Sequence, residues 1–453
     1  MSNTLKITVE ILSNDGAIIK QEIAYSKLFS QPNSINELGF RHQEQIDILQ
    51  SVQDKFIFQQ IDIINKQIVY CEKCGTQMSK KGYTKSDFNA VFTDHKVPCS
   101  RKVCSKCNHR SIPSVKSIFG THIHPDLAKL QLEASSNYTY REAQEHLNSM
   151  VCNKRKANNH TGLKALTELA GMYMDTYPEI IKKEVSASSE LIVEIDGGHL
   201  KTIEDQRSIE ALTSVIYNPK NIEQVGGKIK KDGSMSKNKT IITSKSCRAS
   251  ALIDAQESIK SQTIQAAIEQ GLTKDTSVTA LCDGASNCWS VVDVFENKCS
   301  NVMRILDWFH VAMKFKNTGL SKVDLNEKLE GAKWFLWHGD ATSCLERLSE
   351  IKTLILNDQK SLNKIDKLYT YIDNNKDFIV DYDLRKKQGM VVGSGLVEST
   401  VGHLINTRCK GRQRMRWSRK GAQAVLIVRA AVNDKNWQEN WEKQVNNILK
   451  YVA

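Results

Sequence analysis

The chain has 453 residues, too many for one compact core, so two to four domains are expected. Its hydrophobic content of 40% and charged content of 25% are those of an ordinary soluble globular protein, and no window approaches about eighteen uninterrupted apolar residues, which argues against a membrane span. The N-terminus lacks the layout of a secretory signal, so we expect a cytoplasmic protein. The formal charge of +12 and the pI near 9.0 fit a polyanionic partner, although many proteins of this charge bind no nucleic acid.

The first part of the chain reads as a strand or hairpin (1–37) followed by a helix (38–66). Residues 67–113 contain two cysteine pairs with short β-like pieces between them, and residues 122–183 are helical apart from the polar run 153–159. Two short helices, opening near Thr139 and near Asn159, fit a helix-turn-helix and a plain helical hairpin equally well.

From Leu191 onward the pattern changes to α/β. Short β-branched or apolar runs predict four strands and one helix, and residues 311–390 are again helical, with Trp334, Phe335 and Trp337 as large apolar anchors. The expected strands are Leu191–Ile195, Ala211–Tyr217, Ser277–Cys282 and Val302–Leu306, and the expected helix is Ala251–Gln270. A Gly393-Ser394-Gly395 break then begins a helix that carries Glu398.

The two cysteine pairs, Cys71 with Cys74 and Cys104 with Cys107, are Cys-x-x-Cys turns. Two such turns complete the four-sulfur set that zinc prefers, and clustered cysteines in a reducing compartment indicate metal. Gly75 and Asn108, which follow the pairs, tolerate the left-handed backbone of such turns. We therefore predict a structural zinc site, and we expect the nearby Cys99, His95 and His109 to be ordinary residues rather than substitute ligands.

Three acidic residues stand where a metal-dependent nuclease needs them. Asp196 and Asp283 each follow an expected strand and precede glycine, the place where ligands bind in α/β sheets, and Glu398 lies on a later helix that could pack on the sheet. Hard oxygen ligands could hold two divalent ions for phosphodiester cleavage. A chain with 51 acidic residues also offers accidental triples, and aspartate at a strand end is a common helix cap.

The sequence also resembles a known protein family, which indicates a fold and a function. The run Val392–Ser399, followed by Asn406–Lys410 and Arg414–Ser418, closely resembles bacterial insertion-sequence transposases of the ISKra group, which are relatives of the Mutator-like DDE transposases. The blocks Asp283–Ala285 and Leu306–Val311 are similar to those of the same group, and the resemblance covers roughly residues 68–434.

The resemblance implies an α/β fold with an RNase H-like mixed-sheet core and an all-helical insertion. It implies a D-D-E triad on Asp196, Asp283 and Glu398 that binds Mg²⁺ or Mn²⁺, with Asp307 and His310 supporting the active site. It also implies a cytoplasmic, nucleoid-associated enzyme that acts on transposon ends and target DNA, as a homo-oligomer in the synaptic complex. The chain then divides into an N-terminal strand and helix segment (1–66), a zinc-ribbon-like module (67–113), a helical region with a helix-turn-helix candidate (114–185), the first part of the core (186–310), the helical insertion (311–390), and the second part of the core with a basic C-terminal segment (391–453).

Two basic stretches are candidate phosphate clamps. No acidic residue stands between Glu398 and Asp434, and the lysine-rich stretch from Lys228 to Arg248 contains a single acid, Asp232. The residues expected to bind DNA are Arg408, Lys410, Arg412, Arg414, Arg416, Lys228, Lys230 and Lys231. The rival interpretations are a nuclease that cuts without strand transfer and a zinc-containing DNA-binding regulator derived from a transposase.

Overall fold

The computed structural model describes residues 2–177, 185–204, 207–226, 239–320, 322–356, 358–393, 402–410 and 416–452. Glu398 lies outside these residues, as do Lys228, Lys230, Lys231, Arg412 and Arg414. The chain divides into two compact units, one formed by Met1–Tyr177 with Gln438–Ala453 and the other by Pro178–Trp437. No helix in the described part of the chain is both long enough and apolar enough to span a membrane.

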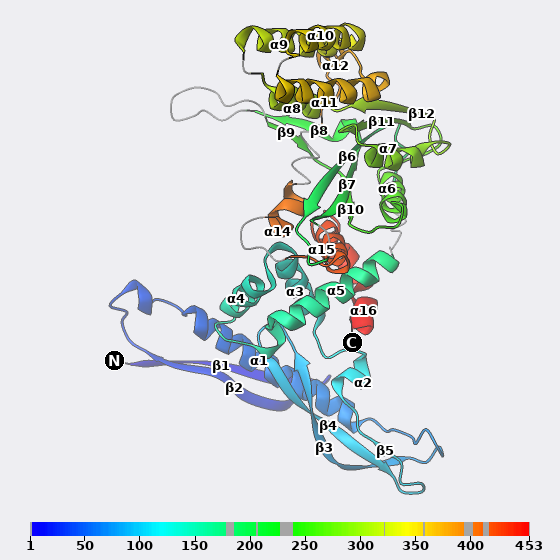
Figure 1. Cartoon of the computed structure of the whole chain (residues 1–453). Coiled ribbons are helices and arrows are strands. Elements are labelled where there is room, and N and C mark those ends of the chain that lie inside the picture. Colours follow the sequence, from blue (N-terminus) through cyan, green and yellow to red (C-terminus); the bar gives the residue numbers. More distant parts are fainter. Residues whose placement is uncertain are drawn as a thin grey trace. The chain divides into compact units, whose positions relative to one another are not determined.

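The first unit begins with the predicted hairpin and helix and continues into a small sheet and a group of helices (Figure 1). Its elements are β1 (Asn3–Leu12), β2 (Ile18–Phe29), α1 (His42–Lys66), β3 (Met78–Asn89), β4 (Asp94–Cys104), β5 (Arg110–Ser111), α2 (Val115–Phe119), α3 (Pro125–Asn137), α4 (Tyr140–Met150), α5 (His160–Thr176) and α16 (Trp437–Val452). Strands β3, β4 and β5 form an antiparallel sheet, and α1 packs on it through Ile57 and Ile61, which meet Val97 and Cys99 of β4.

The helices of the first unit begin at the polar residues that the sequence indicated. Thr139 and Glu142 form a capping box at the start of α4, and the Asn159 side chain caps α5. Residues 151–159 connect the two helices. This connection is longer than the turn of about 3–4 residues in a helix-turn-helix. Although the sequence grouped residues 391–453 with the core, α16 contacts this unit: Tyr451 meets Tyr173 of α5, and Lys129 of α3 bonds to Gln438.

The second unit contains a five-stranded sheet in the order β10-β7-β6-β11-β12. Its elements are β6 (Glu190–Leu200), β7 (Ile209–Tyr217), β8 (Ile222–Val225), β9 (Lys239–Ile242), β10 (Ser246–Ser250), α6 (Glu257–Glu269), β11 (Ser277–Cys282), α7 (Ser286–Val292), β12 (Asn301–Leu306), α8 (Trp308–Thr318), α9 (Val323–Trp337), α10 (Ala341–Leu354), α11 (Gln359–Asn375), α12 (Tyr382–Lys387), α14 (Thr407–Cys409) and α15 (Arg419–Val432). Strands β6, β11 and β12 are parallel, whereas β7 runs antiparallel to β6 and to β10.

Alternation along β6 decides which face of the sheet is apolar. Leu191, Val193 and Ile195 are buried in a core with α6 and α7, so the residues between them face the other way. A second core fills the helical region from α8 to α11 and reaches Leu306 at the end of β12. Figure 1 shows α8 and α11 next to β11 and β12, with α9 and α10 farther from these strands.

Three sequence-based boundaries or roles in this unit are wrong. β6 does not end at Ile195 but continues to Leu200, because Gly197 and Gly198 remain paired with β7. The helix expected from Ala251 begins only at Glu257, because Ala255 and Gln256 have positive φ values of 53° and 66°. Trp334 is no core anchor, because 51% of it is exposed.

Candidate functional site

The four predicted zinc ligands come together in the first unit. Cys71 and Cys104 begin two turns with the same hydrogen bonds: the Cys71 N–H donates to Thr76 O (2.9 Å), as the Cys104 N–H does to His109 O (2.9 Å). Gly75 and Asn108 have the predicted left-handed backbone, with φ values of 69° and 56°. The residues thus form two equivalent cysteine turns that face each other.

The sulfur geometry fits a single tetrahedral ion. All four sulfur atoms lie within 4.8 Å of one another, and Sγ–Sγ separations are 3.5 Å for Cys71–Cys107, 3.4 Å for Cys74–Cys104 and 3.6 Å for Cys74–Cys107. A tetrahedron with Zn–S bonds of about 2.3 Å has edges of about 3.8 Å, whereas a disulfide would need about 2 Å. The four cysteines could therefore bind structural zinc.

The ionisation of the thiols also favours a cation. The Thr76 hydroxyl, with the Thr76 backbone and Cys104, lowers the pKa of Cys74 to about 6. The His109 N–H lowers the pKa of Cys107, but the neighbouring thiols outweigh it and raise that pKa to about 12. Four adjacent thiolates need a positive charge between them, which zinc would provide.

Two of the residues that were candidates for substitute zinc ligands lie outside the four-cysteine cluster, as expected. Cys99 is buried between α1 and β4, and His95 bonds to Asp54 of α1.

In the second unit, three aspartates directly follow the last residues that pair in parallel across β6, β11 and β12. Ile195, Cys282 and Leu306 are register partners across β6, β11 and β12. The next residues along the chain are Asp196, Asp283 and Asp307. Neighbouring strands lie about 4.8 Å apart, so the three aspartates stand at one level of the sheet. Asp283 follows the end of β11 as predicted, whereas Asp196 lies inside β6 rather than at its end.

Asp307 and His310 form a bonded pair at the start of α8. Asp307 is fully buried; its Oδ1 accepts the Phe309 N–H (3.0 Å), which caps the helix, and its Oδ2 accepts a hydrogen bond from His310 Nδ1 (2.6 Å). The other ring nitrogen of His310, Nε2, lies 3.9 Å from Asp196 Oδ1. Asp307 thus fixes a histidine that faces the aspartate of β6.

The charges in this cluster are coupled. Burial raises the pKa of Asp196, and the charges of Asp283 and Asp307 raise it further, against lowering by His310 and by the Gly197 N–H. Burial lowers the pKa of His310, but the hydrogen bond to Asp307 and the charges of all three aspartates outweigh it, so the pKa of His310 lies above its ordinary value. The cluster therefore has excess negative charge, which a proton or a metal cation would relieve.

Residues of the helical region hold the two strand ends, and no sequence motif indicated this role for them. The Tyr371 hydroxyl of α11 donates to Asp283 O (2.9 Å), and the buried Tyr382 hydroxyl donates to Leu306 O (2.6 Å). Gly284 has a φ of +90°, and a Cβ there would lie 2.9 Å from both Asn375 Nδ2 and Leu306 Cδ1. Only glycine fits this turn without displacement of its neighbours.

The described chain on one side of the Glu398 block lies at Asp307, and on the other side it lies at Gly198, two residues after Asp196. A Cβ at Gly393 would lie 3.1 Å from Asp307 Oδ1, and the Trp308 N–H donates to Val392 O (3.3 Å). Beyond the block, a Cβ at Gly198 would lie 3.1 Å from Ile405 Cδ1 and 3.7 Å from Lys410 Nζ.

The basic residues that the structure describes have different surroundings. Lys410 is half-buried beside Gly198, and Arg416 is exposed, so both are accessible to a ligand. Arg408 is fully buried, with its guanidinium 4.9 Å from the Trp417 ring centre, so its expected role as a phosphate contact is wrong for this conformation. Two further arginines of the basic stretches pair with acids from elsewhere in the chain. Arg248 bonds to Glu269 at 2.6 Å, and Arg419 Nε lies 3.9 Å from Glu204 Oε2, whose carboxylate also accepts the backbone N–H of Arg419.

Comparisons with known proteins add little. No family model and no curated protein matches this sequence. Among solved structures, the "Drosophila P element transposase strand transfer complex" aligns over 69% of this chain and 93% of that chain, with 8% identity and a TM-score of 0.30. A likeness at this level carries no argument about the fold or the activity of the chain.

Proposed function

We propose that this protein is a DDE-type DNA transposase, which binds the ends of its own insertion sequence, cleaves them in a metal-dependent reaction and joins them to target DNA. The observation that carries the proposal is the level placement of Asp196 in β6 and of Asp283 directly after the neighbouring parallel strand β11, with His310 facing Asp196. The mixed five-stranded sheet is compatible with the RNase H-like core that the family resemblance implies.

In the proposed site, Asp196, Asp283 and Glu398 would hold two Mg²⁺ or Mn²⁺ ions. When bound, such ions would activate the attacking water or 3′-hydroxyl and stabilise the departing oxygen. The carboxylate oxygens are donors of the hard type that these ions take, and burial together with the charges of Asp283 and Asp307 raises the pKa of Asp196. Asp307 acts through His310 by holding its ring, so Asp307 is a positioning residue in this proposal.

Support for Glu398 comes from its neighbours along the chain. Gly393, on one side of the block, lies against Asp307, and Ile405, on the other side, lies against Gly198. One described flank thus lies at Asp307 and the other at Gly198, two residues after Asp196, which favours a role for the one acid between them. The proposal also assigns phosphate contacts to Lys410, whose ammonium lies near Gly198, and to the exposed Arg416. The four-cysteine module would contribute to DNA binding without taking part in the reaction.

The test is a cleavage and joining assay with duplexes that carry the DNA immediately outside the gene. With Mg²⁺ or Mn²⁺ we expect nicks at the element ends and joined products with a second duplex, and with Ca²⁺ binding but little cutting. Asp283→Asn should retain DNA binding and lose cleavage by a factor of at least about 10³, because it removes a metal ligand while keeping the side-chain volume. Cleavage by Asp283→Asn at the wild-type rate would refute the assignment.

The same assay separates the rivals. A nuclease would cut without forming joined products. A zinc-containing regulator would bind the duplexes but cut neither strand with any of the three ions.

A further inference from the structure

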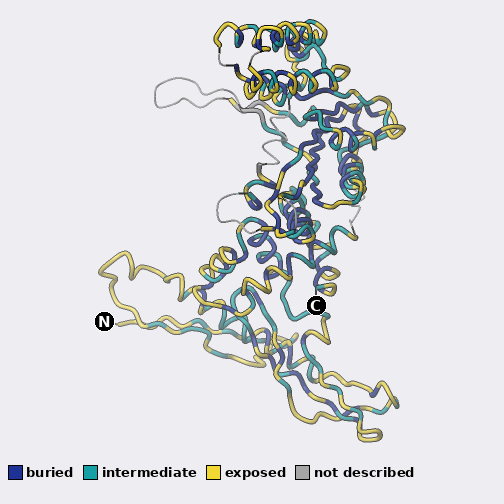
Figure 2. The backbone as a smooth tube through the Cα atoms, viewed as in Figure 1, coloured by how far each residue is buried: buried dark blue, intermediate teal, exposed yellow. Residues whose placement is uncertain are grey.

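The N-terminal hairpin is an exposed surface that the proposed reaction does not use. In the described residues of β1 and β2 no side chain is fully buried, and Figure 2 shows this part of the chain as exposed or intermediate. Leu12, Ile18, Ile23 and Leu28 are 53%, 58%, 55% and 73% exposed. A two-stranded hairpin is marginally stable alone, and an edge strand with unpaired backbone groups can pair with another chain.

The two edges of the hairpin differ. β2 has two bulges, because Ala24 and Ile19 are extra residues opposite β1, whereas β1 runs from Asn3 to Leu12 without an interruption. Bulges are a common means of preventing unwanted pairing at an edge strand. β2 is the one described strand to which β1 is hydrogen-bonded, so the regular outer edge of β1 remains available for another strand.

The sequence of β1 is complementary to itself. When two copies run antiparallel with Thr8 opposite Thr8, Lys6 of each copy faces Glu10 of the other. On the opposite face Leu5 meets Ile11, and Ile7 meets Val9. Opposite charges, threonine pairs and apolar pairs are all favourable when directly opposed across antiparallel strands.

We propose that two copies of this chain associate through β1, in this register, to form a continuous four-stranded antiparallel sheet. Shifting the centre of the pairing to Ile7 places Lys6 opposite Thr8, and shifting it to Val9 places Lys6 opposite Leu12, so neither shift makes a charge pair. The charges therefore select the register centred on Thr8. The two copies then keep α1 on the same face of the sheet, the face on which Tyr25 and Lys27 of β2 bond to Glu44.

Charge-exchange variants of the full-length protein test the pairing, without DNA or added divalent metal. Lys6→Glu alone, or Glu10→Lys alone, places like charges opposite each other twice per dimer, and we expect the dimer to dissociate about tenfold more readily. An equimolar mixture of the two variants should regain the wild-type association, since every pair in the mixed dimer has opposite charges. Sedimentation equilibrium over a concentration series distinguishes the 51.2 kDa chain from a particle of twice that mass.

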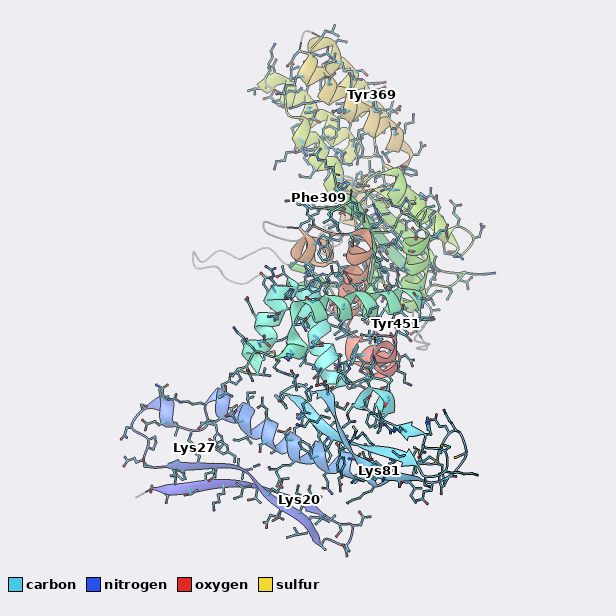
Figure 3. The ribbon with its side chains drawn as sticks, turned by 60° about the horizontal axis from the view of Figure 1, so that its bottom comes forward. Lys20, Lys27, Lys81, Phe309, Tyr369 and Tyr451 are labelled. Atoms are coloured by element: carbon cyan, nitrogen blue, oxygen red, sulfur yellow. The ribbon has the colours of Figure 1, made fainter. Side chains whose placement is uncertain are left out.

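Lys20→Glu is the matched control, because it makes the same charge change on the bulged strand β2 (Figure 3 labels Lys20 and Lys27 on this strand). It should associate as the wild type does. A wild-type protein that sediments as 51.2 kDa at all concentrations would overturn the proposal, as would single variants that associate as strongly as the wild type.

A cross-link tests the register itself. Thr8→Cys should form a disulfide between copies under mild oxidation, because directly opposed residues have Cα atoms about 4.5–5.5 Å apart, within the range of a disulfide. Thr4→Cys should not cross-link above the wild type oxidised in parallel, because Thr4 faces Leu12 of the other copy in this register. Equal cross-linking of both variants would refute the register. These tests use neither cleavage nor DNA, so their failure would leave the proposed transposase activity untouched.

Discussion

Gly284 offers a direct test of how the strand ends hold the proposed site. The change Gly284→Ala combines a positive φ of +90° with a Cβ that would lie 2.9 Å from Leu306 Cδ1 and from Asn375 Nδ2. The backbone strain costs about 1–2 kcal/mol and the overpacking about 1–3 kcal/mol, so the loss of stability should be about 3 kcal/mol. For a unit of this size that corresponds to a Tm lower by about 9 °C.

Gly389→Ala separates the two contributions. Gly389 also has a positive φ, +74°, but a Cβ there would meet nothing within 4 Å. Its substitution should therefore cost the backbone strain alone, about 1–2 kcal/mol, and lower Tm by about 4 °C. Scanning calorimetry of both variants gives the comparison. Equal shifts would show that the tight contacts of Gly284 do not exist in solution, and cleavage by folded Gly284→Ala at the wild-type rate would show that the turn does not position Asp283.

Three further predictions follow from the described contacts. Purified wild-type protein should contain about one zinc per chain. The double variant Cys74→Ser, Cys107→Ser should lose this zinc, whereas Cys99→Ser, which changes a cysteine outside the cluster, should retain it. Equal zinc in the wild type, the double variant and Cys99→Ser would disprove the site. Lys410→Ala should reduce the slope of log affinity against log salt for DNA by about 1, and an unchanged slope would exclude a phosphate contact. Because the pKa of His310 in the folded protein is raised, the stabilising contribution of this residue is complete below about pH 6.5 and is lost as pH rises through the folded pKa. With chelator present, Tm measured from pH 6 to 9 should therefore fall more steeply for the wild type than for His310→Gln. Parallel curves would contradict the coupling between His310 and the aspartates.

The zinc turns were predictable from the sequence because their geometry is local. Each Cys-x-x-Cys pair closes its own turn, and the residue type after it already indicates the left-handed backbone that Gly75 and Asn108 adopt. The proximity of the two pairs could also be predicted, because both pairs flank short β-like pieces, which form β3 and β4.

Other features depend on contacts between residues that are far apart in the chain, and local sequence patterns did not reveal them. The sequence predicted a strand that ends at Ile195, before Asp196 and the glycines, yet pairing with β7 keeps Gly197 and Gly198 extended inside β6. The tyrosines that fix the strand ends are separated from their acceptors by 88 residues for Tyr371 and by 76 for Tyr382, so no local pattern could reveal them. Charge in a sequence window likewise gives no burial, and for that reason Arg408 was misassigned to the surface.

The geometry of Asp307 bears on which acids complete the proposed metal site. Asp307 stands level with Asp196 and Asp283, so three aspartates alone could have been a ligand set. However, both of its carboxylate oxygens are engaged, one with the Phe309 N–H and the other with His310, and the residue is fully buried. These two bonds already give the buried Asp307 carboxylate the task of orienting His310, so the proposal takes the third metal ligand from another element. The chain between Gly393 and Gly402 has one acid, and its described flanks contact Asp307 and Gly198, which is why the proposal assigns that place to Glu398 and gives Asp307 the task of holding His310.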